Sequence, residues 1–172
     1  MILVAGATGN AGGAVVRALL DRGGRVRGLV RDDRSALPDG AEAAVGDLNL
    51  PETLVPHLDG VTAVFLLSGY DGLVDTLDNM RRAGVERVVL LSSSGAPSGD
   101  LTNAVARYHI LSERAVSESG LAWTFLQPNS FMTNTLQWAP QLQKGDVVRA
   151  PSHRCQWRPS TRPTSAPWRR LR

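Results

Sequence analysis

The apolar residues of this chain fall into short, dense runs separated by longer segments of mixed character. Runs at residues 2–5, 26–30, 41–45, 61–67, 85–91 and 122–126 predict strands, the run at 41–45 being the weakest. The runs at 61–67 and 85–91 are almost continuously apolar, which is typical of strands buried on both faces of a parallel sheet.

The segments between these runs have helical spacing. Asn10 is a candidate N-cap for a first helix, whose apolar face is formed by Ala14, Val15, Ala18 and Leu19. Further helices are predicted after Pro51 and at residues 71–83, 103–119 and 129–143, with Pro140 as a potential break in the last. Alternating strands and helices predict one doubly wound α/β domain over residues 1–150, with a parallel sheet and helices on both faces.

A glycine-rich turn lies between the first predicted strand and the first predicted helix. Its pattern is GxxGxxG, and its residues include Gly6, Thr8, Gly9, Asn10, Ala11 and Gly12. One glycine permits the tight turn, one lets the backbone approach a pyrophosphate, and one lets the helix pack closely on the strand. The N–H groups at the helix start then favour phosphate, so the turn predicts a Rossmann-like dinucleotide site.

Arg31 follows the second predicted strand, where the adenosine ribose is expected. A guanidinium there suits the 2′-phosphate of NADP, whereas an acidic residue would suit NAD, and Asp32 is one position further on. The sequence favours NADP(H), with NAD as the second choice and a solvated charge as the structural alternative for Arg31.

Further candidates follow the carboxyl ends of the later strands, where ligands bind in open parallel sheets. Asp47 is a candidate partner of the adenine amino group or else a helix cap, and Leu48 would lie against the ring. Ser68 and Ser92 are either candidates for the nicotinamide half of the cofactor site or ordinary loop serines, and Leu67 and Pro128 are further candidate cofactor-binding residues.

These stretches together resemble the NmrA-like branch of the atypical short-chain dehydrogenase/reductase family. The resemblance rests on residues 6–12, 29–31, 46–48, 83–89, 119–124 and 127–132 and covers about residues 1–150. It implies NADP(H) binding and reduction of a quinone or carbonyl compound. A non-catalytic NADP(H) sensor and an inactive truncated product are the alternatives.

The catalytic pattern of short-chain dehydrogenases is incomplete here. That family pairs a tyrosine with a lysine four residues later and a serine after the fifth strand, which makes Tyr108 and Ser93 the candidate catalytic residues. Position 112 is serine, which brings no positive charge, so Tyr108 could equally pack its helix on the sheet. His109 is expected to be structural, and Arg107 and Glu113 to form a solvated helix edge.

Composition excludes several other classes of protein. The single cysteine, Cys155, allows no internal disulfide, and no metal site is predicted. No apolar stretch is long enough to span a membrane, and residues 1–13 lack the pattern expected of a signal peptide, so a cytoplasmic protein is expected. A small-molecule substrate is the expected partner, and the sequence leaves the oligomeric state open.

The basic character lies in the last 22 residues. Residues 151–172 hold six of the 19 basic residues and no acidic one, so the rest carries 13 basic against 16 acidic residues and predicts no nucleic-acid footprint. This tail lacks Val, Ile, Phe and Met, and we expect it to be disordered. An arginine-rich nucleic-acid arm or a cloning remnant are its alternative readings.

A shifted reading frame is the origin we favour for this tail. In the shifted frame, each new codon consists of one codon's third base and the first two bases of the next codon. The codons for Cys155, Trp157 and Ser160 can begin with T, which becomes the middle base of the new codon and permits a hydrophobic residue. The permitted translation resembles a further strand and helix, so the C-terminal substrate lobe of the family is expected to be missing.

Overall fold

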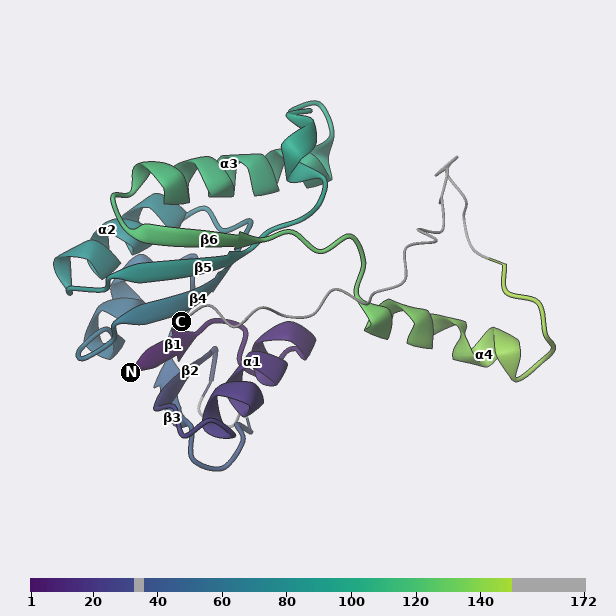
Figure 1. Cartoon of the computed structure of the whole chain (residues 1–172), viewed down its shortest axis with the longest axis horizontal. Coiled ribbons are helices and arrows are strands. Elements are labelled where there is room, and N and C mark those ends of the chain that lie inside the picture. Colours follow the sequence, from purple (N-terminus) through teal and green to yellow (C-terminus); the bar gives the residue numbers. More distant parts are fainter. Residues whose placement is uncertain (33–35, 150–172) are drawn as a thin grey trace, which may run out of the picture. The chain divides into compact units, whose positions relative to one another are not determined.

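The computed structural model describes residues 1–32 and 36–149, and the tail predicted for 151–172 lies outside these described residues. Its elements follow the alternation expected from the sequence (Figure 1): β1 (Ile2–Val4), α1 (Asn10–Leu20), β2 (Val26–Val30), β3 (Glu42–Val45), η1 (Pro51–His57), β4 (Ala63–Leu67), α2 (Leu73–Arg82), β5 (Arg87–Leu91), η2 (Ala96–Ser98), α3 (Ala104–Glu118), β6 (Ala122–Leu126), η3 (Met132–Trp138) and α4 (Ala139–Leu142). The η elements are 3₁₀ helices.

The six strands form one parallel sheet in the order β3-β2-β1-β4-β5-β6. The order reverses between β1 and β4, which is the topological switch point of a Rossmann fold, where ligands bind beyond the carboxyl ends of the strands. The predicted doubly wound parallel sheet is therefore confirmed.

Two apolar clusters cover the two faces of the sheet. On one face, Val16 of α1 packs with Val4 and Phe65 of the sheet. On the other, η1, α2 and α3 contribute a larger cluster that includes Leu54, Leu58, Leu77, Met80 and Val116. Helices thus lie on both faces, as predicted.

Helix boundaries depart from the prediction at two places. Asn10 is not the N-cap of α1, because that position is taken by Gly9, and no side chain caps the helix. The helix expected at 129–143 is instead the 3₁₀ turn η3 followed by the four-residue α4. Pro140 does not interrupt a helix but lies in the first turn of α4, where its missing N–H costs nothing.

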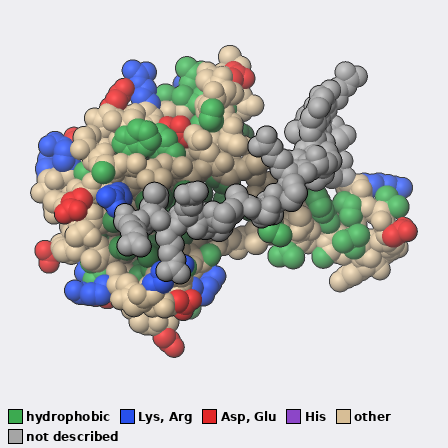
Figure 2. All heavy atoms as spheres, in the orientation of Figure 1, with side chains coloured by type: hydrophobic (Ala, Val, Ile, Leu, Met, Phe, Trp, Pro, Cys, Tyr) green, Lys and Arg blue, Asp and Glu red, His purple; other side chains and the backbone are tan. Residues whose placement is uncertain are grey.

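The chain divides into two units, Met1–Asn134 and Thr135–Arg172. In the second unit, the Gln141 side chain bonds both backbone groups of Arg149, accepting from N–H at 2.8 Å and donating to the carbonyl at 3.1 Å. The first unit holds the sheet, and on the face that Figure 2 shows, acidic and basic side chains are mixed around its rim. Both cavities described below belong to the first unit.

Candidate functional site

The glycine turn after β1 has the geometry that its sequence predicted. Gly6 has a φ of +62°, a conformation that favours glycine, and Gly9 N–H donates to its carbonyl at 2.8 Å. A Cβ on Gly12 would lie 2.2 Å from the carbonyl oxygen of Gly6, so glycine is required for α1 to approach β1 this closely. The first helical hydrogen bond runs from Gly13 N–H to Gly9 O, which places the N–H groups of residues 10–12 in the first turn, without a partner four residues earlier.

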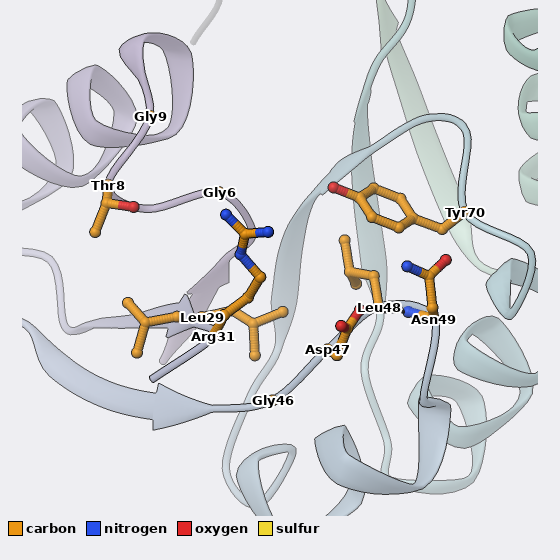
Figure 3. Close-up of a pocket in the computed structure, with 11 residues that line it drawn as sticks. Gly6, Thr8, Gly9, Leu29, Arg31, Gly46, Asp47, Leu48, Asn49 and Tyr70 are labelled. Atoms are coloured by element: carbon orange, nitrogen blue, oxygen red, sulfur yellow. Dashed lines mark hydrogen bonds between the residues drawn. The ribbon is translucent and has the colours of Figure 1, made fainter. Parts of the chain in front are cut away.

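A cavity of about 340 Å³ opens beside this turn, at the carboxyl ends of β1, β2 and β3 (Figure 3). Six predicted cofactor-binding residues line it: Gly6, Thr8, Gly9, Arg31, Asp47 and Leu48. In Figure 3 the Arg31 side chain extends from the end of β2 toward the glycine turn. A cation thus lines the cavity that the start of α1 borders, which suits an anionic ligand.

Asp47 has a local structural role within this cavity wall. Its Oδ1 accepts a hydrogen bond from Asn49 N–H at 2.8 Å, and its own N–H donates to Thr53 Oγ1 at 2.9 Å. The helix-cap alternative is not what the structure shows, because Leu50 is the N-cap of η1 and no side chain caps that element.

A second cavity of about 260 Å³ lies beyond the carboxyl ends of β4 and β5. It is lined by the predicted residues Leu67, Ser68, Ser92, Ser93, Tyr108 and Pro128 and by further residues that include His109, Asn129 and Phe131. Leu67 also lies below the glycine turn, since a Cβ on Gly6 would be 2.8 Å from Leu67 Cδ1. One ligand passing over the turn could therefore reach both cavities.

Asn10, Ala11 and Gly12 line neither cavity, because they belong to the first turn of α1. Tyr70, in contrast, was not predicted and lines the first cavity, with its ring beside Leu48 in Figure 3. An aromatic residue three positions after a buried strand was the available signal. Asn49 was missed as well, although it directly follows two predicted residues.

Tyr108 lines the second cavity and also packs against the loop after β4. A Cβ on Gly69 would be 3.1 Å from Tyr108 Cδ2, and the side chain of Tyr108 is 40% exposed. Ser112, at the position where the short-chain dehydrogenase pattern has lysine, accepts a hydrogen bond from Gly69 N–H at 3.2 Å and donates one to Tyr108 O at 2.8 Å. Ser112 therefore connects the backbone of α3 to the loop after β4.

Glu113 is not on a solvated edge, and this prediction was wrong. Its Oε1 accepts hydrogen bonds from Ser92 Oγ at 2.5 Å and from Gln127 Nε2 at 2.8 Å. The adjacent Ser112 is buried, so this side of α3 faces the sheet, and Glu113 lies half-buried at the border between α3, β5 and the residues after β6. Arg107 is exposed, as expected.

His109 lies on the cavity side of α3, with its ring centroid 4.1 Å from that of Tyr108. Its Nδ1 atom is buried and has no hydrogen-bond partner among the residues that the structure describes. Burial lowers the pKa of the imidazole below its ordinary value, and the negative charge of Glu113 one helical turn away opposes this shift.

The described part of the chain holds neither a membrane-spanning helix nor a metal-binding cluster. No helix there is long and apolar enough to cross a membrane. Within residues 1–32 and 36–149, His, Cys, Asp and Glu side chains form no group of three or more that could hold a metal ion.

Comparison with known proteins identifies relatives that are similar in sequence. The chain is 37% identical over 155 residues to the (4-alkanoyl-5-oxo-2,5-dihydrofuran-3-yl)methyl phosphate reductase of Streptomyces griseus. The aligned region covers 87% of this chain and 55% of the relative. It is also 37% identical over 158 residues to the NAD(P)H azoreductase of Xenophilus azovorans, covering 85% and 54%. The chain thus spans about half the length of these curated relatives.

A solved structure of an NADPH-dependent quinone oxidoreductase from Escherichia coli, in complex with NADPH, has the same fold. It superimposes with a TM-score of 0.72 at 25% identity, over 82% of this chain and 53% of that one. The family model described as NAD(P)H-binding matches residues 6–151, which include the glycine turn and both cavities. The chain therefore belongs to this NAD(P)H-binding family.

Proposed function

We propose that the chain binds NADP(H) along the carboxyl edge of its sheet and serves in the reduction of a quinone or carbonyl small molecule, as an NmrA-like short-chain reductase. The observation that carries this proposal is the pair of cavities on either side of the glycine turn, with a cation in the first and hydroxyl and imidazole groups in the second. This arrangement suits the chemistry of a dinucleotide, which has a phosphate-bearing adenosine half and a nicotinamide half.

The residues of the first cavity fit the adenosine and phosphate part of NADP(H). The N–H groups of residues 10–12 would hold the pyrophosphate at the start of α1, and Gly9 brings no side chain into the cavity that it lines. Arg31 would bind the 2′-phosphate, and Leu48 would lie against the adenine ring. The Asp47 carboxylate oxygen that is not bonded to Asn49 would accept a hydrogen bond from the adenine amino group.

The residues of the second cavity fit the nicotinamide and the substrate. Leu67, Ser68, Ser92 and Pro128 would surround the nicotinamide, and the bound cofactor would supply a hydride to the substrate. Tyr108 and Ser93 present hydroxyl groups in the same wall, and Ser93 Oγ accepts a hydrogen bond from Gly95 N–H at 3.2 Å. Loss of turnover in Tyr108→Phe would assign Tyr108 as a proton donor, and unchanged turnover would leave it a packing role.

The similarity to two reductases and a quinone oxidoreductase supports a redox activity for this chain. A non-catalytic NADP(H) sensor would use the same first cavity, so cofactor binding alone does not separate the two functions. Turnover of NADPH with an acceptor does.

Fluorescence titration of the purified chain with NADPH and with NADH tests the proposal, followed by an assay of NADPH oxidation with p-benzoquinone. We expect NADPH to bind at least about tenfold more tightly than NADH, a difference of some 1.4 kcal/mol. Binding without oxidation would favour the sensor, and equal or absent binding of both nucleotides would contradict the proposal.

A further inference from the structure

The two nitrogens of the His109 imidazole have different surroundings. Nδ1 is shut off from solvent and has no hydrogen-bond partner within residues 1–32 and 36–149. The ring nevertheless lines the second cavity, so Nε2 is the nitrogen through which it can bond a molecule there. The ring of Tyr108 lies beside the imidazole, with the ring centroids 4.1 Å apart and the planes tilted by 39°.

These surroundings select one protonation state of the ring. A proton on Nδ1 would be a buried N–H without an acceptor, which is costly, and a charged imidazolium would bury such a donor together with its charge. The neutral tautomer with its proton on Nε2 avoids both costs. The lowered pKa of His109 agrees with a neutral ring at pH 7.

We propose that His109, as a neutral imidazole, donates a hydrogen bond from Nε2 to the oxygen atom of the substrate that is being reduced. The inference rests on the proposed function and names a catalytic residue for it. A carbonyl substrate takes the hydride from NADPH at its carbonyl carbon, and the C=O π electrons move onto oxygen. A quinone takes up the hydride to give the hydroquinone monoanion, whose charge also lies on oxygen. NADPH becomes NADP⁺ in both cases, and the Nε2–H group stabilises the resulting oxyanion. A proton, delivered by the Tyr108 hydroxyl or directly by water, then completes the alcohol or hydroquinone.

This role supplies a hydrogen-bond donor to a cavity whose described lining residues include no lysine or arginine. Position 112 supplies no positive charge, and Tyr108 and His109 are the only ionisable side chains among the described residues that line the cavity. Glu113 is the charged group that acts on His109, and its Oε1 is already bonded to Ser92 and Gln127. Beside the Tyr108 hydroxyl, the imidazole N–H is therefore a neutral donor that this wall offers to a developing oxyanion.

Substitution of His109 tests the assignment, with p-benzoquinone as the probe. We expect kcat to fall by about 10²- to 10³-fold in His109→Phe, as for the loss of one oxyanion donor. His109→Gln retains an amide N–H and should recover part of this loss. Arg107→Gln, an exposed change on the same helix, should leave kcat unchanged. The NADPH dissociation constant should stay within about twofold in all three variants, since one N–H to the substrate contributes nothing to cofactor affinity.

The pH dependence of kcat distinguishes a neutral donor from an acid. A neutral donor gives a constant kcat from about pH 7 to 9, whereas an imidazolium acid would lose about tenfold per pH unit. A tenfold loss of kcat per pH unit, or an unchanged kcat in His109→Phe, would overturn the proposal. If the chain still binds NADPH, the proposed function stands in either case. Failure of the wild-type chain to bind NADPH would overturn both.

A spectroscopic measurement serves even if turnover is absent. In ¹⁵N NMR spectra at pH 7, the imidazole of His109 should show a protonated Nε2 and an unprotonated Nδ1. Addition of p-benzoquinone to the NADP⁺-loaded chain should shift the Nε2 resonance. A proton on Nδ1, or no shift of Nε2, would overturn the proposal.

Discussion

The hydroxyl of Ser92 donates a hydrogen bond of 2.5 Å to Oε1 of Glu113, which ties the end of β5 to α3. Ser92 is only 3% exposed, so water cannot replace this acceptor. In Glu113→Ala the buried hydroxyl would lose its partner, and we expect the free energy of unfolding to fall by about 1–3 kcal/mol. Urea denaturation of the two proteins measures the difference.

Glu118→Ala is the matched control on the same helix. Glu118 pairs with Arg114 at 2.9 Å, but both side chains are more than 60% exposed, and such surface pairs contribute about 0–1 kcal/mol. Equal losses of unfolding free energy in the two variants would show that the Ser92–Glu113 hydrogen bond stabilises the fold no more than an exposed ion pair does.

Close packing of α1 on β1 requires the absence of a side chain at Gly12. A Cβ there would meet three backbone atoms of Ala5 and Gly6 within 2.8 Å, and backbone cannot move aside as a flexible side chain can. Gly12→Ala should therefore lower the free energy of unfolding by about 1–3 kcal/mol and weaken NADPH binding, as thermal unfolding and fluorescence titration would show.

Gly95→Ala provides the comparison for this variant. The added Cβ would meet atoms of Ser93 and Ala106 at 3.7 and 4.0 Å, which is ordinary van der Waals contact, and Gly95 has a φ of −78°. Its stability should change by less than about 0.5 kcal/mol. Comparable destabilisation by both substitutions would argue against the steric explanation.

The sheet and the first cavity could be predicted because their signals are local. Continuous apolar runs marked β4 and β5, and the spacing of Gly6, Gly9 and Gly12 marked the turn together with its place at the sheet edge. Arg31 and Asp47 were found because each directly follows a strand, and parallel strands bring such residues to one edge.

Glu113 could not be placed from the sequence, because its partners Ser92 and Gln127 are far from it in the chain. From the sequence alone, a carboxylate in the middle of a helix is predicted to be solvated, because only tertiary packing determines which face of the helix lies against the sheet. The N-cap at Gly9 was missed for a different reason. The glycine turn itself sets the direction in which α1 begins, which leaves Asn10 inside the helix.

The pairing of Arg27 with Glu42 across β2 and β3 predicts a pH dependence of stability. Hydrogen bonds from Arg27, with the charges of Arg27 and Arg25, lower the pKa of Glu42 below its ordinary value of 4.5. A lowered pKa in the folded state stabilises the protein above pH 4.5, and this contribution is lost as the pH falls through the lowered value.

Urea denaturation between pH 6 and pH 3 should therefore show a smaller loss of stability in Glu42→Gln than in the wild-type chain. Because Glu42 is exposed, salt at about 1 M, where the Debye length is about 3 Å, should shrink the difference between the two proteins. Parallel pH profiles at low salt would contradict the assignment.

Arg31 is the residue on which the preference for NADPH over NADH is expected to depend. It lines the first cavity at the end of β2, and a charged hydrogen bond to a phosphate contributes about 1.5–3 kcal/mol. Arg31→Gln should therefore raise the dissociation constant of NADPH by at least about tenfold and leave that of NADH nearly unchanged, since NADH has no 2′-phosphate. Arg82→Gln, at the exposed end of α2, removes the same charge far from the glycine turn and should affect neither. An equal loss for both nucleotides in Arg31→Gln would mean that this side chain supports the cavity as a whole and does not read the 2′-phosphate.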